Sequence, residues 1–177
     1  MHEIEVKLKF EDKISVLHKL IELNATSKSQ YSLRDTYYSL EHRNMKNAQD
    51  LLRIRQKDNK TELTFKGKCE NESKIWKRIE LTTGVEDGKT MTEILEHLKF
   101  NKILENVSYR EYWQVDDVEI AFISLKIPCE LEWIEIEGPS ERKVQSVLNH
   151  IKDLTKVVGE EYFKKIDEAR EKSKKVE

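Results

Sequence analysis

Charged and hydrophobic residues alternate along several segments of this chain, starting at its N-terminus. Glu3, Glu5 and Lys7 occupy every second position there, with Ile4 and Val6 between them. Alternate side chains of a β-strand point to the same face of a sheet, so this segment is predicted to be a strand with one charged and one hydrophobic face. The same period of two predicts seven further strands, over residues 35–39, 51–56, 62–66, 76–82, 109–115, 118–122 and 133–137.

Other segments carry hydrophobic residues at the three- and four-residue spacing of amphipathic helices. One helix is predicted after the acidic pair at 11–12, a second after the turn at 86–88, and a third after the Pro-Ser pair at 139–140. Hydrophobic residues at 162–166 indicate a shorter fourth helix. Because the helices separate groups of strands and do not follow every strand, the order favours an α+β fold. We expect a large antiparallel sheet, curled or closed, with the helices packed outside.

Length and composition indicate an ordinary globular protein. The chain has 177 residues, and we expect a single domain over 1–177, whose charged end from about 160 to 177 is a solvated helix or a tail. Lys and Arg number 32 against 34 Asp and Glu, and the net charge of −2 does not indicate a nucleic acid or an anionic membrane as partner. No hydrophobic run approaches the roughly 18 to 20 residues of a membrane span, so we expect a cytoplasmic protein. Cys69 and Cys129 lack the paired spacing of a zinc site and are predicted to be reduced thiols.

The charged positions of the predicted strands carry both signs of charge. Their neighbours within the strands, among them Ile54, Phe65, Ile79, Leu81 and Ile136, are predicted to pack outward against the helices. A closed sheet would then gather the charges in its interior, where charges without partners are costly. Six basic and six acidic residues are placed there: Lys7, Arg53, Arg55, Lys66, Arg78 and Arg110, with Glu3, Glu5, Glu62, Glu80, Glu135 and Glu137.

A divalent metal ion and a polyphosphate would together pair with these charges. Arginine binds phosphate oxygens through two N–H groups and lysine adds a point charge, so the six basic residues are candidates to bind a small-molecule triphosphate. The sequence contains no G-x-x-x-x-G-K-[ST] or G-x-G-x-x-G motif, which excludes the two commonest phosphate-binding loops. Mg²⁺ or Mn²⁺ prefers carboxylate oxygens. The candidate metal ligands are Glu3, Glu5, Glu135 and Glu137, with Glu62 and Glu80 as additional interior acids.

The chain resembles the CYTH family, also called the triphosphate tunnel metalloenzymes. The N-terminal signature of that family, Glu-x-Glu-x-Lys, is matched at residues 3–7. A single match of this kind arises by chance on charged strands, but further segments match in the order of the family. They are Arg34-Asp35-Thr36-Tyr37-Tyr38, Leu52-Arg53-Ile54-Arg55, Leu63-Thr64-Phe65-Lys66-Gly67, Arg78-Ile79-Glu80 and Ile134-Glu135-Ile136-Glu137-Gly138.

This resemblance implies an eight-stranded antiparallel β-barrel that forms a tunnel. A divalent metal would be held by glutamates of the first and last strands, and basic residues would surround a triphosphate. The family includes class IV adenylyl cyclases and thiamine, inorganic and RNA triphosphatases, so the fold leaves the reaction open. The chain looks most like the cyclases, which implies conversion of ATP to cyclic AMP and pyrophosphate. Tyr37 and Lys66 match positions that are thought to activate water in the thiamine-triphosphatases, and they are candidate catalytic residues. The resemblance is also compatible with a homodimer.

One departure from the family precedes the last predicted strand. Members commonly carry an acidic or amide residue there, followed by a turn that contains glycine. Residues 123–132 offer no clear counterpart, with Ser124 nearest, and one substrate or metal contact is expected to be missing. The second cation that many members carry beside Arg110 is not evident either. A non-catalytic polyphosphate-binding module therefore stands as an alternative to a cyclase and to a triphosphatase acting on inorganic, thiamine or nucleoside triphosphate.

Aromatic and histidine residues carry weaker indications. The five histidines share no metal-binding spacing. His42 and Arg43 could reach a mouth of the tunnel. Trp76, Trp113 or Trp133 could stack on adenine if one of them lies near an opening.

Overall fold

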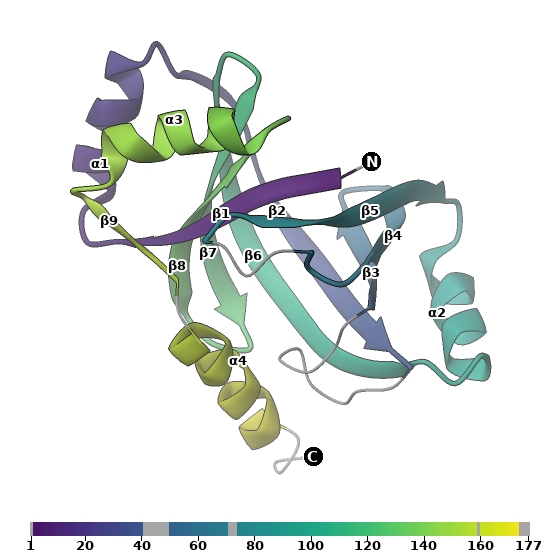
Figure 1. The fold of residues 1–177 in the computed structure, drawn as a ribbon. Coiled ribbons are helices and arrows are strands. Elements are labelled where there is room, and N and C mark those ends of the chain that lie inside the picture. The colour runs from purple at the N-terminus through teal and green to yellow at the C-terminus, as the bar shows by residue number, and fades with distance from the viewer. Residues whose placement is uncertain (1, 41–49, 71–73, 159, 174–177) are drawn as a thin grey trace.

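The computed structural model describes residues 2–40, 50–70, 74–158 and 160–173 (Figure 1). Eight antiparallel strands close into a barrel, in the order β5-β4-β3-β2-β6-β7-β8-β1, and pairing of β1 with β5 completes the ring. The predicted α+β fold with an eight-stranded barrel is confirmed. The strands are β1 (His2–Phe10), β2 (Thr26–Ser39), β3 (Leu51–Lys57), β4 (Lys60–Lys66), β5 (Trp76–Val85), β6 (Asn101–Val115), β7 (Val118–Ile127) and β8 (Leu131–Glu137).

Two strands begin well before the segments that the sequence pattern predicts. β2 begins at Thr26 and β6 at Asn101, several residues before the predicted segments at 35–39 and 109–115. The first part of β2 is rich in Ser, Lys and Gln and is mostly exposed, so it lacks the alternation from which strands were predicted. A short further strand, β9 (Thr155–Val157), pairs with the end of β1 and was not predicted.

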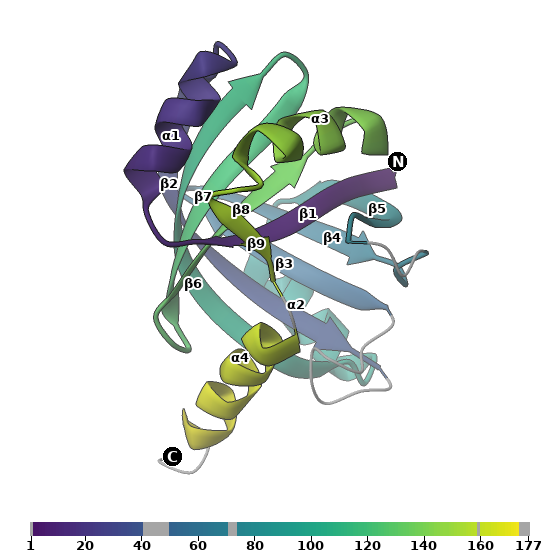
Figure 2. The ribbon, with the colours of Figure 1, turned by 60° about the vertical axis from the view of Figure 1, so that its left-hand side comes forward.

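In the part of the chain that the structure describes, four helices accompany the barrel: α1 (Lys13–Glu22), α2 (Gly88–His97), α3 (Glu141–Ile151) and α4 (Glu160–Ser173). The first three begin where predicted. Asp12, Asp87 and Ser140 accept hydrogen bonds from backbone N–H groups of the first turns of α1, α2 and α3, as capping residues do. Figure 2 shows α1 and α3 together near one end of the barrel, with α4 at the other end.

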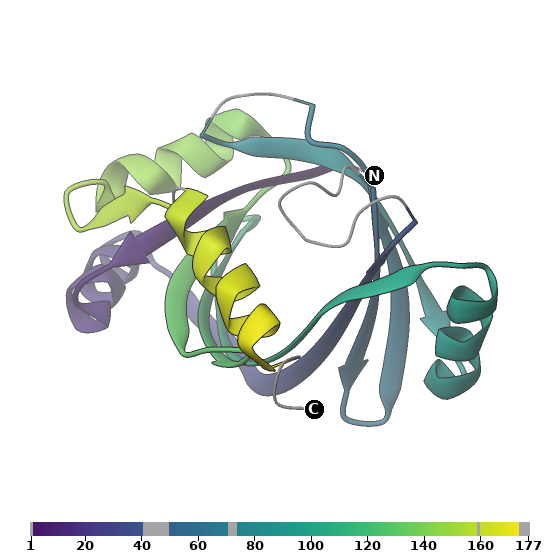
Figure 3. The same ribbon diagram turned by 90° about the horizontal axis from the view of Figure 1, so that it is seen from below.

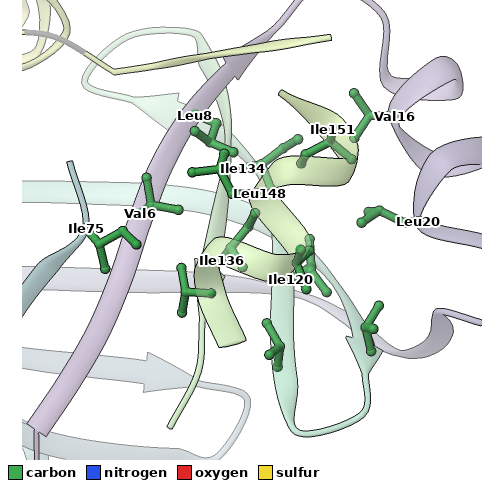
Figure 4. Packing of buried hydrophobic residues seen from close by; sticks show 14 of the residues in the cluster. Val6, Leu8, Val16, Leu20, Ile75, Ile120, Ile134, Ile136, Leu148 and Ile151 are labelled. Carbon is green, nitrogen blue, oxygen red and sulfur yellow. The ribbon is translucent and has the colours of Figure 1, made fainter. Parts of the chain in front are cut away.

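The main hydrophobic core lies outside the barrel, between β1, β7 and β8 and the helices α1 and α3 (Figure 4). Val6 and Ile136 on the outer face of the sheet are buried with Leu20 of α1 and Leu148 and Ile151 of α3. Each fully buried side chain of this size contributes about 1.5–3 kcal/mol. The alternation in β1 and β8 therefore points hydrophobic residues into this core and charged residues to the interior of the barrel.

The outer face of β5 differs from the prediction. Ile79 and Leu81 are 43% and 57% exposed, so the expectation that both pack against helices is wrong. α2 lies on the opposite side of the barrel from α1 and α3 (Figures 1 and 3), and its Leu95 packs with Ile54 of β3. Two groups of helices cover only part of the outer surface, and the outward face of β5 lies beyond both.

α4 lies across one end of the barrel, as Figure 3 shows. Ile166 packs against a hydrophobic cluster that includes Tyr112, Ile123 and Trp133 from β6, β7 and β8. The Arg170 guanidinium donates a hydrogen bond to the backbone carbonyl of Ile103 in β6. These contacts join the helix to the barrel wall. Within the described ranges, no helix has the length and hydrophobicity needed to cross a bilayer.

Candidate active site

A cavity of about 190 Å³ lies inside the barrel. Hydrophobic side chains of α4 and β6, Ile166 and Leu104, contribute to its lining together with charged residues of the strands. Every predicted site residue except Glu62 lines it. These residues are Glu3, Glu5, Lys7, Tyr37, Arg53, Arg55, Lys66, Arg78, Glu80, Arg110, Glu135 and Glu137.

Strand register explains why residues far apart in the sequence meet here. Lys7 lies opposite Glu135 on β8, and Glu3 lies opposite Arg78 on β5. Glu62 follows the same alternation in β4 but is exposed and does not line the cavity. The period-two pattern therefore predicts which face of a strand points inward. The position of a residue along the strand decides whether its side chain reaches the cavity.

Glu3 is held between two cations on one side of the cavity. Its carboxylate oxygens lie 2.7 Å from Lys66 Nζ and 2.5 Å from Arg78 Nε. Burial opposes ionisation of Glu3, but the charges of Lys66 and Arg78 outweigh it and lower the pKa of this carboxyl. Lys66 also pairs with Glu80, and Arg78 reaches Glu5 at 3.4 Å. The candidate catalytic Lys66 is thus engaged by two carboxylates in this arrangement.

Glu135 is held in the same way across the cavity. It pairs with Lys7, lies 3.2 Å from Arg110, and accepts a hydrogen bond of 3.0 Å from Trp133 Nε1. Burial disfavours the charged form, but Lys7 and Arg110 lower the pKa of Glu135. Lys7 also lies 3.2 Å from Glu5, so it joins two of the predicted metal ligands.

Asp35 is a charged residue of the interior that was not predicted as a site residue. It is fully buried, and its two carboxylate oxygens accept hydrogen bonds of 2.7 Å from Arg55 Nε and NH2. Arg110 approaches it at 3.7 Å. Burial disfavours ionisation, but the bonds to Arg55 prevail and the pKa of Asp35 is lowered. Asp35 could have been recognised in the sequence from its spacing of two residues from Tyr37, because residues two apart in a strand share a face.

Glu119 of β7 is the second interior acid that was not predicted. It lines the cavity, whereas the Ser124 hydroxyl donates to Glu132 on the exposed surface, 2.8 Å away. Residues 123–132 were expected to lack the family's acid, and Glu119 supplies an acid to the cavity five residues before Ser124. Burial raises the pKa of Glu119. Glu119 could have been recognised from its position between Val118 and Ile120, because these two belong to the main core and the residue between them points to the other face.

Glu137 lies opposite Glu119 on the neighbouring strand, and the pKa of its carboxyl is raised. Burial, followed by the charges of Glu3, Glu5 and Glu119, raises the pKa of Glu137 to about 7. Among the residues that the structure describes, neither Glu137 nor Glu119 makes an ion pair. These two carboxylates are the part of the cavity where negative charge is least compensated.

The interior suits a divalent cation and an anion by its donor chemistry. Carboxylate oxygens are the ligands that Mg²⁺ and Mn²⁺ prefer. Within the described ranges no three Asp, Glu, His or Cys side chains are grouped as metal ligands, and Lys or Arg side chains pair with most of the acids of the cavity. Two buried polar atoms, Arg53 Nε and Asn106 Oδ1, have no hydrogen-bond partner in the described part of the chain. A buried N–H donor of a guanidinium without an acceptor fits an anionic ligand.

The aromatic and histidine residues considered in the sequence differ in where they lie. Tyr37, Trp76 and Trp133 line the cavity, whereas Trp113 packs against the main core on the other face of the sheet. None of the histidines within the described ranges lines the cavity. His42 and Arg43 lie outside the described residues.

Comparison with known proteins identifies the family. The family model for the CYTH domain matches residues 1–169. A protein of Methanocaldococcus jannaschii named "Putative adenylate cyclase" is 30% identical over 120 residues, which is 67% of each chain. A solved structure from Pyrococcus horikoshii OT3 covers 87% of this chain and 94% of its own with a TM-score of 0.70 at 19% identity.

A plant structure shows how little the fold alone says of the reaction. The Hippeastrum protein, described as an adenylyl cyclase candidate with a dominant triphosphatase activity, covers 89% of this chain and 91% of its own, with a TM-score of 0.64 at 13% identity. Proteins with this barrel are thus described both as adenylyl cyclases and as triphosphatases. With a family model that spans nearly the whole sequence and a barrel interior that carries the family's charged motifs, this chain belongs to the CYTH domain family.

Proposed function

We propose that this protein is a divalent-metal-dependent enzyme that binds a triphosphate inside the barrel and converts ATP to cyclic AMP and pyrophosphate. The observation that carries the proposal is the cavity itself, in which six Lys and Arg side chains face five of the six predicted acids. Arg53 Nε, buried and without a partner in the described part of the chain, supports an anionic ligand. The name of the relative from M. jannaschii supports the choice of reaction.

The residues of the cavity would act by binding and charge stabilisation. Arg53, Arg78 and Arg110 offer planar N–H donors that suit phosphate oxygens, and Lys7 and Lys66 add point charges. In the cyclase reaction the ribose 3′ oxygen bonds to the α-phosphorus, the bond to the bridging oxygen breaks, and pyrophosphate leaves. Cations around the leaving group would stabilise its growing negative charge.

A divalent cation, held by glutamates of the cavity, would supply further neutralisation of the phosphate charge. Among the described residues, Glu137 is the predicted ligand that makes no ion pair, whereas Glu5 contacts Lys7 and Arg78. Glu3 and Glu135 each contact two basic side chains and would hold these in position.

A triphosphatase is the second candidate, and a specific observation favours it. Tyr37 and Lys66 both line the cavity, as expected for the pair that resembles the water-activating residues of the thiamine-triphosphatases. Water would then attack the terminal phosphorus and orthophosphate would leave. The same cations would bind the substrate in either reaction.

Product analysis separates these functions. The protein is incubated with ATP, thiamine triphosphate or inorganic triphosphate and Mg²⁺ or Mn²⁺, and products are resolved by anion-exchange chromatography. We expect cyclic AMP and pyrophosphate from ATP, with loss of turnover by at least about 100-fold in Arg53→Gln because a phosphate contact in the transition state is removed. The exposed Arg142 of α3 provides the matched control, and Arg142→Gln is expected to retain activity.

Other outcomes assign other functions. Orthophosphate without cyclic AMP would replace the cyclase with a triphosphatase. Binding of triphosphate without turnover of any substrate would replace both with a binding module. Equal activity of Arg53→Gln and the wild type would contradict the proposed site.

A further inference from the structure

Three glutamates form a row across neighbouring strands of the barrel. Glu5 of β1 lies opposite Glu137 of β8, and Glu137 lies opposite Glu119 of β7. All three line the cavity. Neighbouring strands are only about 4.8 Å apart, and like charges directly opposite one another destabilise a sheet. Lys7 and Arg78 already pair with Glu5, so the uncompensated repulsion lies between Glu137 and Glu119, and a cation inside the barrel would relieve it.

The acids of the cavity differ in how their charges are already compensated. Glu3 contacts Lys66 and Arg78, and Glu135 contacts Lys7 and Arg110. In the part of the chain that the structure describes, Glu119 and Glu137 contact no cation within ion-pair distance. Ligation of a metal by Glu3 or Glu135 would break two ion pairs, whereas ligation by Glu119 or Glu137 would break none of those described.

A separate observation favours an anion in the same cavity. Arg53 is 8% exposed, and its Nε has no acceptor among the described residues. Mg²⁺ and Mn²⁺ usually bind through one or a few carboxylates together with phosphate oxygens of the substrate. A cation at the glutamate row and a phosphate group at Arg53 would satisfy both uncompensated regions at once.

Resting on the proposed function, we propose that Glu119 is a ligand of the divalent cation, together with Glu137. Glu135 then acts as a positioning residue that holds Lys7 and Arg110 for the triphosphate. The acid near Ser124 that the family resemblance led us to expect is replaced in this role by Glu119, whose side chain reaches the cavity from an earlier position of the same strand.

Binding of Mn²⁺ alone and of inorganic triphosphate alone tests this assignment without relying on turnover. Calorimetry and the electron paramagnetic resonance signal of bound Mn²⁺ are compared for the wild type, Glu119→Gln, Glu135→Gln and Glu132→Gln. We expect Glu119→Gln to weaken Mn²⁺ binding by about 10-fold or more, because it removes a charged ligand while keeping the size of the side chain. Metal-free triphosphate binding should not weaken, since a negative charge has left the cavity.

The controls separate ligation from structural damage. Glu132 is an exposed acid of β8 that contacts Ser124, and Glu132→Gln should bind both ligands as the wild type does. Glu135→Gln should weaken Mn²⁺ binding less than Glu119→Gln does. The reverse order, or Mn²⁺ affinity in Glu119→Gln equal to that of the wild type, overturns the proposal.

The remaining outcomes also decide between the two proposals. Parallel loss of Mn²⁺ and metal-free triphosphate binding in Glu119→Gln would indicate a structural role and overturn the assignment of Glu119 alone. A wild-type protein that binds neither ligand would overturn the proposed function as well.

Discussion

At the scale of single residues, charge compensation distinguishes side chains that share one alternation pattern. Glu5, Glu135 and Glu137 all follow the pattern of two, yet their surroundings differ. Glu135 is surrounded by Lys7 and Arg110, which lower its pKa, while acidic neighbours and burial raise the pKa of Glu137 to about 7. Identical residue types at equivalent sequence positions therefore acquire different chemistry from the strands that lie opposite them.

The raised pKa of Glu137 predicts a pH-dependent effect on stability. Its ordinary value is 4.5 and its value in the folded protein is about 7, so the folded state binds more protons than the unfolded state between these two pH values. Folding stability is therefore expected to fall as pH rises from about 4.5 to 7. Glu137→Gln removes the effect of Glu137 ionisation on the free energy of unfolding. The melting temperature of this variant should therefore rise relative to that of the wild type as pH increases from about 4.5 to 7.

Thermal unfolding between pH 4.5 and 8, without metal, measures this difference. Glu132→Gln serves as the control for removal of a glutamate charge at the surface of the same strand. A melting-temperature difference between Glu137→Gln and the wild type that is constant with pH would contradict the prediction.

At the scale of secondary structure, a buried charged cluster links three neighbouring strands. Asp35 of β2 binds Arg55 of β3 through two hydrogen bonds, and Arg110 of β6 lies on its other side. The three strands are adjacent in the sheet. Arg55 and Arg110 line the cavity, so the same contacts hold the barrel wall and orient two residues proposed to bind triphosphate.

Removal of Asp35 is expected to destabilise the fold strongly. Asp35→Ala leaves the Arg55 charge without its buried partner, while Arg110 keeps Glu135. Breaking a buried ion pair in this way typically costs about 3–5 kcal/mol in the free energy of unfolding. Urea denaturation monitored by circular dichroism measures the change. Asp117→Ala, which removes an exposed partner of Lys143, is the matched control and should cost about 1 kcal/mol or less. Equal effects of the two substitutions would contradict the structural role of Asp35.

At the scale of the whole molecule, the ion pairs of the cavity connect the binding of metal to that of triphosphate. The basic side chains proposed for the triphosphate are paired with the acids of the same cavity, as in Lys7 with Glu5 and Arg78 with Glu3. Triphosphate would withdraw cations from the acids, and metal would withdraw acids from the cations. Each ligand thus breaks ion pairs that the other ligand would otherwise have to break, and so lowers the free-energy cost of binding the other.

Metal and triphosphate are therefore expected to bind with positive cooperativity. Mn²⁺ affinity should rise about 5- to 150-fold when a non-hydrolysable triphosphate analogue is present, and by linkage the affinity for the analogue should rise by the same factor with Mn²⁺. Calorimetric titrations in both orders measure the two factors, after correction for the affinity of Mn²⁺ for the analogue in solution. Independent binding would contradict the coupling.

Much of this architecture was predictable from local pattern. Helices begin at Asp12, Asp87 and Ser140 because these residues cap them, and the barrel strands were recognised from alternation. The polar first part of β2 and the short β9 lack any such pattern. The exposed outer face of β5, with Ile79 and Leu81, was predicted wrongly because hydrophobic alternation does not say which helix is near enough to cover it.

The sequence by itself determined which face of each strand is charged, since side chains alternate wherever a strand forms. That sufficed to place Glu3, Glu5 and Lys7 in the interior. Only the tertiary structure decided that Glu119 joins Glu5 and Glu137, that Asp35 receives Arg55, and that Glu62 remains exposed. The physical reason is that charge compensation depends on register, on closure of the barrel and on the position of each residue along its strand, and these link segments more than 100 residues apart, as with Lys7 and Glu135.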